Sequence, residues 1–372
     1  MERDPRTVTS FPADVGVSIV CHNNRDKLVA TLASLEAAGC PRSSILVVDV
    51  ASTDGTVDWL RSDYSGITIR TLDRNDGPSP GRNVGIRESP FPFVFLMDAD
   101  VLVQPETIQR LRAAMAEDAK IKIGSPIVVH VNAPDTIQYA DGSLHFICEA
   151  INPWLDRPLR ERGPLPRDIG VAPTCGLLLD RAAAIEVGLF DERYFIGKED
   201  GDFTHRTRLA GYTIRELPSA LVLHHSRPRG TWLFYYQIRN RWHFMLKNYQ
   251  VSTLVLILPC LVVHEPLQAL VLHAKGHGAT YWKAVAGLIR MLPALGRDRA
   301  LTRKIRVLPD VALLRADNLI IRDDLASHPF VRFGKAAYEG WMRGYWHLLQ
   351  RTVLAGSMRS AERTTEAHHS AS

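Results

Sequence analysis

Two aspartates separated by one residue follow an apolar run in the N-terminal half of the chain. They are Asp98 and Asp100, and residues 93–97 precede them. Because side chains i and i+2 of an extended strand point to the same side, we expect the two carboxylates to converge. Two carboxylates at such a short distance favour a cation between them. Mg²⁺ or Mn²⁺ prefers oxygen ligands and keeps substrate phosphate oxygens in its shell. The pair therefore predicts a divalent-metal site that stabilises a leaving diphosphate.

The elements before this pair favour a binding site over a solvated acidic turn. Residues 16–21, 45–50, 67–72 and 93–98 are predicted strands, with predicted helices over 25–38 and after the turn at 52–55. Strand–helix alternation predicts right-handed βαβ units and an α/β fold, with a mostly parallel sheet flanked by helices. Ligands bind at the carboxyl ends of such strands. Asp49 and Asp98 lie at two of these ends.

The character of the chain changes after residue 225. A strand is predicted over 176–179 and a helix over 200–210, followed by an aromatic and basic stretch, an apolar run over 254–263 and a strongly basic segment. We therefore expect an α/β domain over residues 14–225, a helical basic and aromatic C-terminal region over 226–358, and a disordered tail over 359–372.

Composition narrows the classes of protein further. With 372 residues, a net charge of +5 and 46% hydrophobic residues, the chain has an ordinary globular composition. The polar N-terminus contains no apolar stretch of signal-peptide length, so secretion is not expected. The odd number of singly spaced cysteines indicates reduced thiols in a cytoplasmic protein, without a disulfide framework or thiolate zinc site. These cysteines are Cys21, Cys40, Cys148, Cys175 and Cys260.

Several blocks of sequence together resemble the inverting glycosyltransferase family 2, which has the GT-A fold. In chain order they are VSIVCHNNRDKLVATLASL (17–35), VVDVASTDGT (47–56), NDGPSPGRNVGI (75–86), FLMDADV (95–101), GLFDERYFIGKEDGDFTHR (188–206) and LPSALVLHH (217–225). The last two blocks, and the stretch YYQIRNRWHFMLKNY after them, resemble bacterial rhamnosyl- and galactofuranosyltransferases.

The resemblance implies roles on the nucleotide-sugar side. Asp49 matches the acid that contacts the nucleotide base, and Arg82 matches the arginine on the nucleotide side. Asp98 and Asp100 match the metal and diphosphate motif. His22, directly after the first strand, is a further expected nucleotide-sugar contact, but it and Asn23 replace the family's usual Thr-Tyr. Because the second block also departs from the usual pattern, the nucleotide stays open.

Independently of the resemblance, three glycines in the same region would permit close backbone approach to the nucleotide, although ordinary turns explain them equally well. They are Gly77, Gly81 and Gly85.

The resemblance also implies a catalytic pair, Glu199 and Asp200, with Asp200 as the general base. Displacement at an anomeric carbon needs a carboxylate that removes the proton of the acceptor hydroxyl. The alternative is an acidic cap of the helix that follows. His224 matches a histidine that joins the metal shell in some relatives, with His225 as its competitor. Trp154 either stacks on an acceptor sugar or packs in the protein.

The C-terminal region raises the question of a membrane. The apolar run 254–263 is about half of the roughly 20 residues that a spanning helix needs, so no spanning helix is expected. Pro259, His264, Glu265 and Pro266 should interrupt or end it. An aromatic helical face near the C-terminus favours peripheral contact with an anionic membrane, the alternative being a packed helical cap or a dimer contact. That face is formed by Tyr338, Trp341, Met342, Tyr345, Trp346 and Leu349.

These observations predict a metal-dependent glycosyltransferase of polysaccharide biosynthesis. It would move a sugar from a UDP- or dTDP-sugar to a hydroxyl of a glycan or lipid-linked acceptor, with Mg²⁺ or Mn²⁺ as cofactor. The expected location is the cytoplasm, at the inner face of the cell membrane if the C-terminal region binds lipid. The alternatives are a non-catalytic sugar-nucleotide-binding or glycan-binding module and a nucleotidyltransferase. Nucleic acid is not an expected partner, and the oligomeric state is open.

Overall fold

The computed structural model describes residues 10–225, 230–319 and 329–356, so the predicted tail over 359–372 lies outside the described residues. The chain forms two compact units. The first contains residues 10–141, 153–207 and 212–225, and the second contains residues 142–152, 208–211, 230–319 and 329–356. Two stretches inside the predicted domain 14–225 thus cluster with the second unit, and the functional division at residue 225 stays a prediction.

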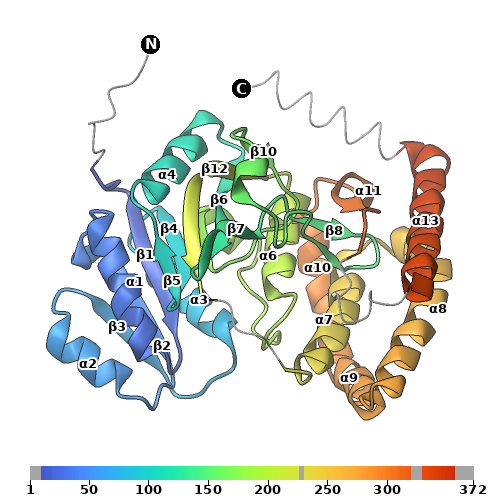
Figure 1. Cartoon of the computed structure of the whole chain (residues 1–372), viewed down its shortest axis with the longest axis horizontal. Helices are drawn as coiled ribbons and strands as arrows, with labels where there is room; N and C mark the ends of the chain where they lie inside the picture. Colours follow the sequence, from blue (N-terminus) through green and yellow to red (C-terminus); the bar gives the residue numbers. More distant parts are fainter. Residues whose placement is uncertain (1–9, 226–229, 320–328, 357–372) are drawn as a thin grey trace. The chain divides into compact units, whose positions relative to one another are not determined.

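The first unit is built on a mixed sheet whose main path runs β10-β12-β6-β11-β4-β1-β2-β3 (Figure 1). Its strands are β1 (Val15–Cys21), β2 (Ile45–Val50), β3 (Thr68–Leu72), β4 (Phe93–Asp98), β5 (Val101–Val103), β6 (Ile121–His130), β7 (Ala133–Tyr139), β10 (Arg167–Asp168), β11 (Gly176–Asp180) and β12 (Thr213–His224). Strands β3, β2, β1 and β4 are parallel neighbours, as are β6 and β12. Strand β11 runs antiparallel between β4 and β6. The predicted α/β sheet is therefore confirmed, with antiparallel strands added to the parallel ones.

Helices connect and cover these strands. They are α1 (Arg25–Ala37), α2 (Thr56–Asp63), α3 (Pro78–Glu88), α4 (Thr107–Glu117), α5 (Arg181–Glu186) and α6 (Glu199–Leu209), with short 3₁₀ turns η1 (Arg42–Ser44) and η2 (Leu159–Glu161). Leu28, Leu32 and Leu35 are fully buried along α1. This is the apolar face that their helical spacing predicts.

Helix α3 gives the glycines of its region a role that we did not expect. A Cβ at Gly85 would overlap the Ser18 side chain of β1, and one at Gly81 would come within 3.0 Å of Val20. Gly77 precedes the helix with φ +89°, and a Cβ there would overlap the carbonyl of Phe195. The expectation that these residues let a nucleotide approach the backbone is therefore wrong for Gly81 and Gly85, which let a helix pack closely on the sheet.

The second unit contains a three-stranded sheet and a set of helices. The strands, in sheet order, are β13 (Leu314–Arg315), β8 (Ser143–His145) and β9 (Ala150–Ile151). The helices are α7 (Leu233–Asn248), α8 (Val251–Ala274), α9 (Gly278–Met291), η3 (Leu292–Ala294), α10 (Leu295–Ile305), α11 (Asp310–Leu313) and α13 (Pro329–Arg351). These elements confirm the predicted helical C-terminal appendage.

Helix α8 is longer than the sequence led us to expect. It runs for 24 residues through Pro259 and Pro266, and it is long and apolar enough to cross a membrane by length and composition alone. The prediction that Pro259, His264, Glu265 and Pro266 would interrupt or end the helix is wrong. Proline removes one helical hydrogen bond, and here the buried side chains of Ile257, Cys260 and Leu261 hold the helix against its neighbours.

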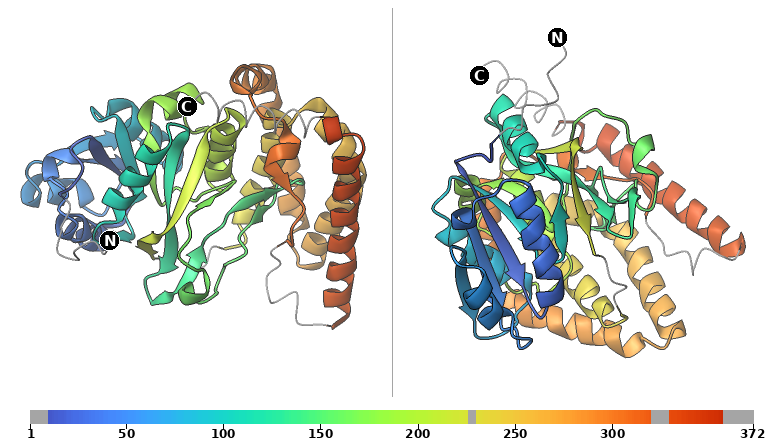
Figure 2. Two further views of the ribbon diagram at one scale, coloured as in Figure 1. Left: turned by 90° about the horizontal axis from the view of Figure 1, so that it is seen from above. Right: turned by 60° about the vertical axis from the view of Figure 1, so that its left-hand side comes forward.

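The aromatic face of α13 also differs from its expected role. Met342, Trp346 and Leu349 are buried, and the Trp346 ring stacks on Phe146 with centroids 4.9 Å apart. Tyr345 donates a hydrogen bond to the Leu256 carbonyl of α8 over 2.7 Å, and α13 lies along α8 in both views of Figure 2. The buried part of this face is therefore protein core, and its predicted contact with lipid is wrong.

Candidate active site

The chain turns at the predicted metal motif. Strand β4 ends at Asp98, and residues 99–100 form a turn before β5. The Asp98 amide donates to the Cys175 carbonyl and the Ala99 amide to the Val20 carbonyl, both over 3.1 Å. The Asp100 carbonyl accepts a hydrogen bond from the His225 amide, also over 3.1 Å. Our reason for expecting the two carboxylates to converge, an extended strand through Asp100, is thus wrong. The carboxylates have different partners.

Asp98 is bonded to Arg82, which also holds the predicted base. One guanidinium nitrogen of Arg82, Nη2, donates to Asp98 Oδ1 over 3.0 Å, and the other, Nη1, donates to Asp200 Oδ1 over 3.0 Å. Glu199 lies 4.0 Å from the same guanidinium, and the Phe190 ring lies 5.6 Å from it. Arg82 is only 4% exposed. It therefore joins α3, β4 and α6 through charge-assisted hydrogen bonds.

Acidic groups outnumber basic ones around this arginine. Burial works to lower the pKa of Arg82, but the neighbouring carboxylates outweigh it and raise that pKa. Removal from solvent raises the pKa of Asp98, and the charge of Arg82 opposes this only in part. Among the described residues, Arg82 pairs with Asp98, Asp200 and, at 4.0 Å, Glu199, while Lys27 pairs with Asp100. Negative charge concentrated in this way favours a cationic ligand.

Asp200 keeps one carboxylate oxygen available. Its Oδ1 accepts hydrogen bonds from Arg82 Nη1 and from the Thr174 hydroxyl. Its Oδ2 accepts none from the residues that the structure describes, and the side chain is 31% exposed. Thr174 is fully buried directly before β11, so its hydroxyl is fixed. The arrangement holds the carboxylate in one orientation and presents one oxygen to an incoming group.

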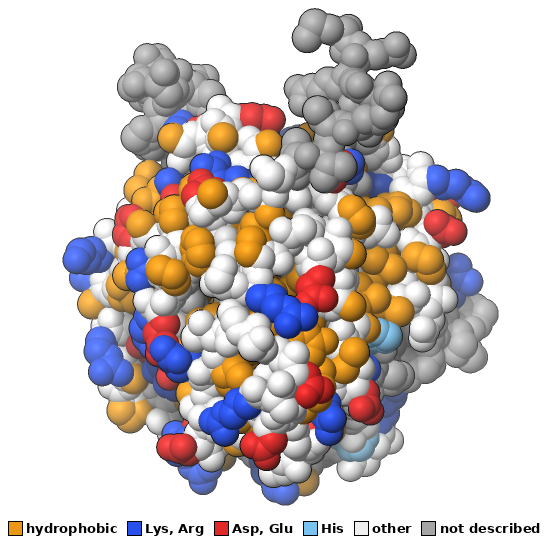
Figure 3. All heavy atoms as spheres, turned by 90° about the vertical axis from the view of Figure 1, so that its left-hand side faces the viewer, with side chains coloured by type: hydrophobic (Ala, Val, Ile, Leu, Met, Phe, Trp, Pro, Cys, Tyr) orange, Lys and Arg blue, Asp and Glu red, His pale blue; other side chains and the backbone are white. Residues whose placement is uncertain are grey.

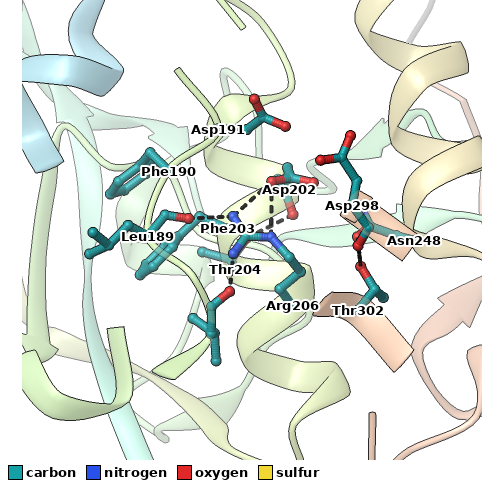
Figure 4. Close-up of polar contacts among 12 residues, drawn as sticks. Leu189, Phe190, Asp191, Asp202, Phe203, Thr204, Arg206, Asn248, Asp298 and Thr302 are labelled. Carbon is teal, nitrogen blue, oxygen red and sulfur yellow. Dashed lines mark hydrogen bonds and ion pairs between the residues drawn. The ribbon is translucent and has the colours of Figure 1, made fainter. Parts of the chain in front are cut away.

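A buried ion pair fixes the helix that carries Asp200. Arg206 donates to Asp202 Oδ2 from Nε over 3.0 Å and from Nη2 over 2.8 Å. The same guanidinium donates to the carbonyls of Val187 and Leu189 in the loop before α6, as Figure 4 shows for Leu189. Both members of the ion pair are buried. Because the guanidinium links the first turns of α6 to the preceding loop, it positions the start of the helix and with it Asp200.

His224 lies beside Asp100, at the end of β12. Its Nδ1 lies 3.0 Å from Gln138 Oε1, and its Nε2 lies 3.6 Å from Asp100 Oδ1. Because an amide oxygen can only accept, Gln138 Oε1 suits the His224 tautomer that carries a proton on Nδ1. Burial acts to raise the pKa of Asp100, but interaction with His224 and then the charge of Lys27, 3.7 Å away, lower it overall.

The predicted metal ligands are only partly assembled. Within residues 10–225, 230–319 and 329–356, no three His, Cys, Asp or Glu side chains form a group that could hold a metal ion. Asp100 and His224 are adjacent, while Asp98 is engaged by Arg82. The pair supplies one oxygen and one nitrogen donor, a chemistry that suits Mn²⁺ and related divalent ions.

Asp49 and His22 lie where the first two strands end. Asp49 is 2% exposed, and its Oδ1 accepts a hydrogen bond from the Ser52 amide over 2.9 Å. Its Oδ2 is buried without a hydrogen-bond partner among the described residues. His22 Nδ1 lies 2.6 Å from the Val50 carbonyl. A buried acceptor oxygen without a donor is the feature expected of a group that binds a ligand N–H.

Trp154 packs within the protein, which is the second of its two predicted roles. Its indole Nε1 donates to Asp141 over 2.6 Å, and the Arg157 guanidinium covers its ring at 4.5 Å. Asp141 also accepts from Arg162, which is buried beside Glu216 at 2.8 Å. Burial raises the pKa of Glu216 to about 7. No sequence pattern predicted this polar cluster.

Two further site residues escaped the sequence analysis, Thr174 and Gln138. Thr174 lies shortly before β11, which is antiparallel to β4, and Gln138 lies in β7, which is antiparallel to β6. When a strand runs antiparallel to its neighbour, it starts beside the carboxyl end of that neighbour. Polar residues just before β11 were therefore candidates, once that direction was known.

Known proteins are similar to this chain in sequence. The sequence model described as "Glycosyl transferase family 2" matches residues 17–188. The chain is 30% identical over 215 residues to the N-acetylglucosaminyl-diphospho-decaprenol L-rhamnosyltransferase of Mycobacterium tuberculosis, covering 52% of this chain and 70% of that protein. It is 24% identical over 253 residues to the dTDP-rhamnosyl transferase RfbF of Shigella flexneri, covering 62% and 79%.

A solved structure supports the same fold. The crystal structure of GalNAc-T7 with UDP, GalNAc and Mn²⁺ superposes with a TM-score of 0.51 at 16% identity, covering 66% of this chain and 49% of that one. Together with the sheet order this confirms the expected GT-A fold. The resemblance to rhamnosyltransferases is confirmed as well, while the resemblance to galactofuranosyltransferases stays a prediction. The chain belongs to glycosyltransferase family 2 and is a glycosyltransferase similar to bacterial rhamnosyltransferases.

Proposed function

We propose that this enzyme transfers a sugar, with inversion at the anomeric carbon, from a UDP- or dTDP-sugar to a hydroxyl of a glycan or lipid-linked acceptor. The observation that carries the proposal is the state of Asp200. Its Oδ1 is saturated by Arg82 and Thr174, and its Oδ2 is open. A general base needs this combination of a fixed orientation and a free lone pair.

In the proposed reaction Asp200 Oδ2 takes the proton of the acceptor hydroxyl. The acceptor oxygen forms a bond to the anomeric carbon while the bond from that carbon to the diphosphate oxygen breaks. The bonding electrons leave with the diphosphate. Attack and departure on opposite faces of one carbon invert its configuration. Glu199, buried and within 4.0 Å of Arg82, is proposed to support the base through the shared arginine and not to take the proton.

The nucleotide part of the donor is proposed to bind near Asp49, His22 and Arg82. The unpaired Oδ2 of Asp49 could accept a hydrogen bond from a base N–H, as uracil and thymine offer. RfbF is named a dTDP-rhamnosyl transferase, so dTDP-rhamnose is the first donor to test. The relative from Mycobacterium tuberculosis is named for an acceptor that carries decaprenol, which makes a polyprenyl-linked acceptor the first to test.

A divalent cation, Mg²⁺ or Mn²⁺, is proposed as cofactor. The residues present fit such an ion, because Asp100 and His224 offer an oxygen and a nitrogen donor atom 3.6 Å apart. Asp100 and His224 would hold it, with Asp98 as the predicted third ligand. When bound, it would supply positive charge that stabilises the leaving diphosphate. Gln138 would keep the His224 ring in the tautomer that binds a metal.

The proposed location is the cytoplasm. All five cysteines are free and buried thiols, which supports a reducing compartment.

Replacement of the proposed base tests the mechanism. We expect Asp200→Asn to lower kcat by about 10²–10⁴-fold, because the amide cannot accept the acceptor proton. The assay is release of nucleoside diphosphate across a panel of donors that begins with dTDP-rhamnose. Asp135→Asn, at an exposed position of β7, is the matched control and should keep full turnover. Near-normal turnover of the Asp200→Asn enzyme would remove Asp200 from the mechanism.

Thr174 should act by positioning the base. Thr174→Val removes the hydrogen bond that orients the Asp200 carboxylate, so kcat should fall by about tenfold or more while KM for the donor stays near the wild-type value. Thr174→Ser keeps the hydroxyl and should restore kcat. If Thr174 were only a packing residue, valine would leave kcat at the wild-type value.

The metal proposal is tested by binding as well as by activity. We expect Gln138→Leu to weaken Mn²⁺ binding by about 10–100-fold, because outer partners of a ligating histidine contribute that much to affinity. Electron paramagnetic resonance titration in the presence of UDP or dTDP measures this directly. Gln104→Leu, on an exposed loop, should bind Mn²⁺ normally. A wild-type protein that binds no Mn²⁺ under these conditions refutes the site.

A further inference from the structure

Helix α8 leaves a long apolar face uncovered within the second unit. Exposed large hydrophobic residues recur along the helix from Val251 to Leu270. They are Val251, Val255, Leu258, Val262, Val263, Leu267 and Leu270. At 1.5 Å per residue this stretch is about 29 Å long. Soluble proteins rarely expose a contiguous apolar surface of this extent without a partner.

Helix α9 also exposes apolar side chains, and basic residues border them. Trp282 and Ile289 are 61% and 59% exposed and lie two turns apart on one side of the helix. Each is followed directly by an exposed basic residue, Lys283 and Arg290. A helix with exposed aromatic and aliphatic side chains bordered by cations is typical of segments that lie in a membrane interface.

The exposed charges in this part of the unit have one sign. Between residues 267 and 306 the only acid is Asp298, which is buried. The exposed basic residues of the same stretch are Lys275, Lys283, Arg290, Arg297, Arg303 and Lys304. By contrast, acidic and basic side chains are interspersed on the face of the molecule in Figure 3. Such an excess of exposed basic side chains over acidic ones complements anionic lipid headgroups.

We propose that α8 and α9 dock on the surface of an anionic bilayer, with the exposed face of α8 inserted at the boundary between headgroups and acyl chains. A second copy of the chain is a poorer occupant. Two copies that met through this region would bring the same cations together, and like charges at an interface are unfavourable. A bilayer accepts the apolar residues and the cations at the same time.

The inner side of α8 indicates that the helix lies on the membrane and does not cross it. Glu265 accepts hydrogen bonds from the buried Arg241 and, over 3.0 Å, from Trp242 Nε1. His264 Nδ1 lies 2.8 Å from the Tyr338 hydroxyl of α13. Drawing α8 into lipid on all sides would break these contacts and deprive the buried Arg241 of Glu265, one of its two carboxylate partners, which is unfavourable.

This inference goes beyond the proposed chemistry and does not depend on it. The residues involved lie outside the site residues, and binding to vesicles needs neither donor nor acceptor. If both proposals hold, docking would bring the enzyme to a surface where polyprenyl-linked acceptors are found. If the transfer mechanism fails, the Asp200→Asn protein should still bind vesicles as the wild type does.

The test is flotation of the full chain with two kinds of vesicle, one of phosphatidylcholine and phosphatidylglycerol and one of phosphatidylcholine alone. We expect the wild type to float with the anionic vesicles and less with the neutral ones. The triple variant Val255→Asp/Leu258→Asp/Val262→Asp should lose about tenfold or more in affinity, because it places charges on the inserted face. Leu165→Asp, at a 72% exposed position of the first unit, is the matched control and should bind normally.

A second pair of changes separates charge from insertion and guards against misfolding of the triple variant. Lys283→Gln/Arg290→Gln should weaken binding to anionic vesicles and leave binding to neutral ones unchanged. The proposal is overturned if the wild type stays soluble with anionic vesicles, or if both sets of variants bind as the wild type does. It is also overturned if the wild type is a dimer that binds no vesicles and the triple variant is a monomer by analytical ultracentrifugation.

Discussion

The site depends on one buried arginine. Arg82 donates to Asp98 and to Asp200, which are 16 and 118 residues away in the sequence. A buried guanidinium without partners would be strongly unfavourable, and so would these carboxylates without a cation between them. The arginine and the carboxylates therefore each offset the unfavourable burial of the other. The same bond explains other features of the first unit, since α3 must lie close against β1 and β2 to bring the arginine in. Gly81 and Gly85 allow that approach, and Arg206 fixes the start of α6 on the opposite side.

Arg82 links a group suited to binding the diphosphate with the proposed general base. Asp100, two residues after Asp98, pairs with His224 and Lys27, and this group of an acid, a histidine and a cation suits a metal-bound diphosphate. Asp200 has a buried hydroxyl on one oxygen and nothing from the described residues on the other. In the proposed reaction the first group stabilises the leaving diphosphate while Asp200 takes a proton. The shared arginine would keep the distance between them constant as charge moves from one to the other.

The sequence was sufficient to predict the α/β fold and most of the charged residues of the site. Apolar runs that end in acid placed Asp49 and Asp98 at strand ends, and Arg82 and Asp200 entered through short motifs. Partners that are distant in sequence could not be found this way. Thr174 and Gln138 meet Asp200 and His224 only because β11 and β7 run antiparallel, a property that periodicity does not encode. Proline spacing also misled, since α8 continues through Pro259, where packing outweighs the lost hydrogen bond.

The stereochemistry of transfer tests the central claim most directly. A single carboxylate that acts as a base permits one displacement, so the new glycosidic bond must have the anomeric configuration opposite to that of the donor. NMR of the product formed in the first turnovers, read at the one-bond coupling constant between the anomeric carbon and its proton, measures this configuration. Inversion is the predicted result. Retention would contradict the account, because it requires either a covalent sugar–enzyme intermediate or departure and attack on the same face, and neither gives Asp200 the role of base.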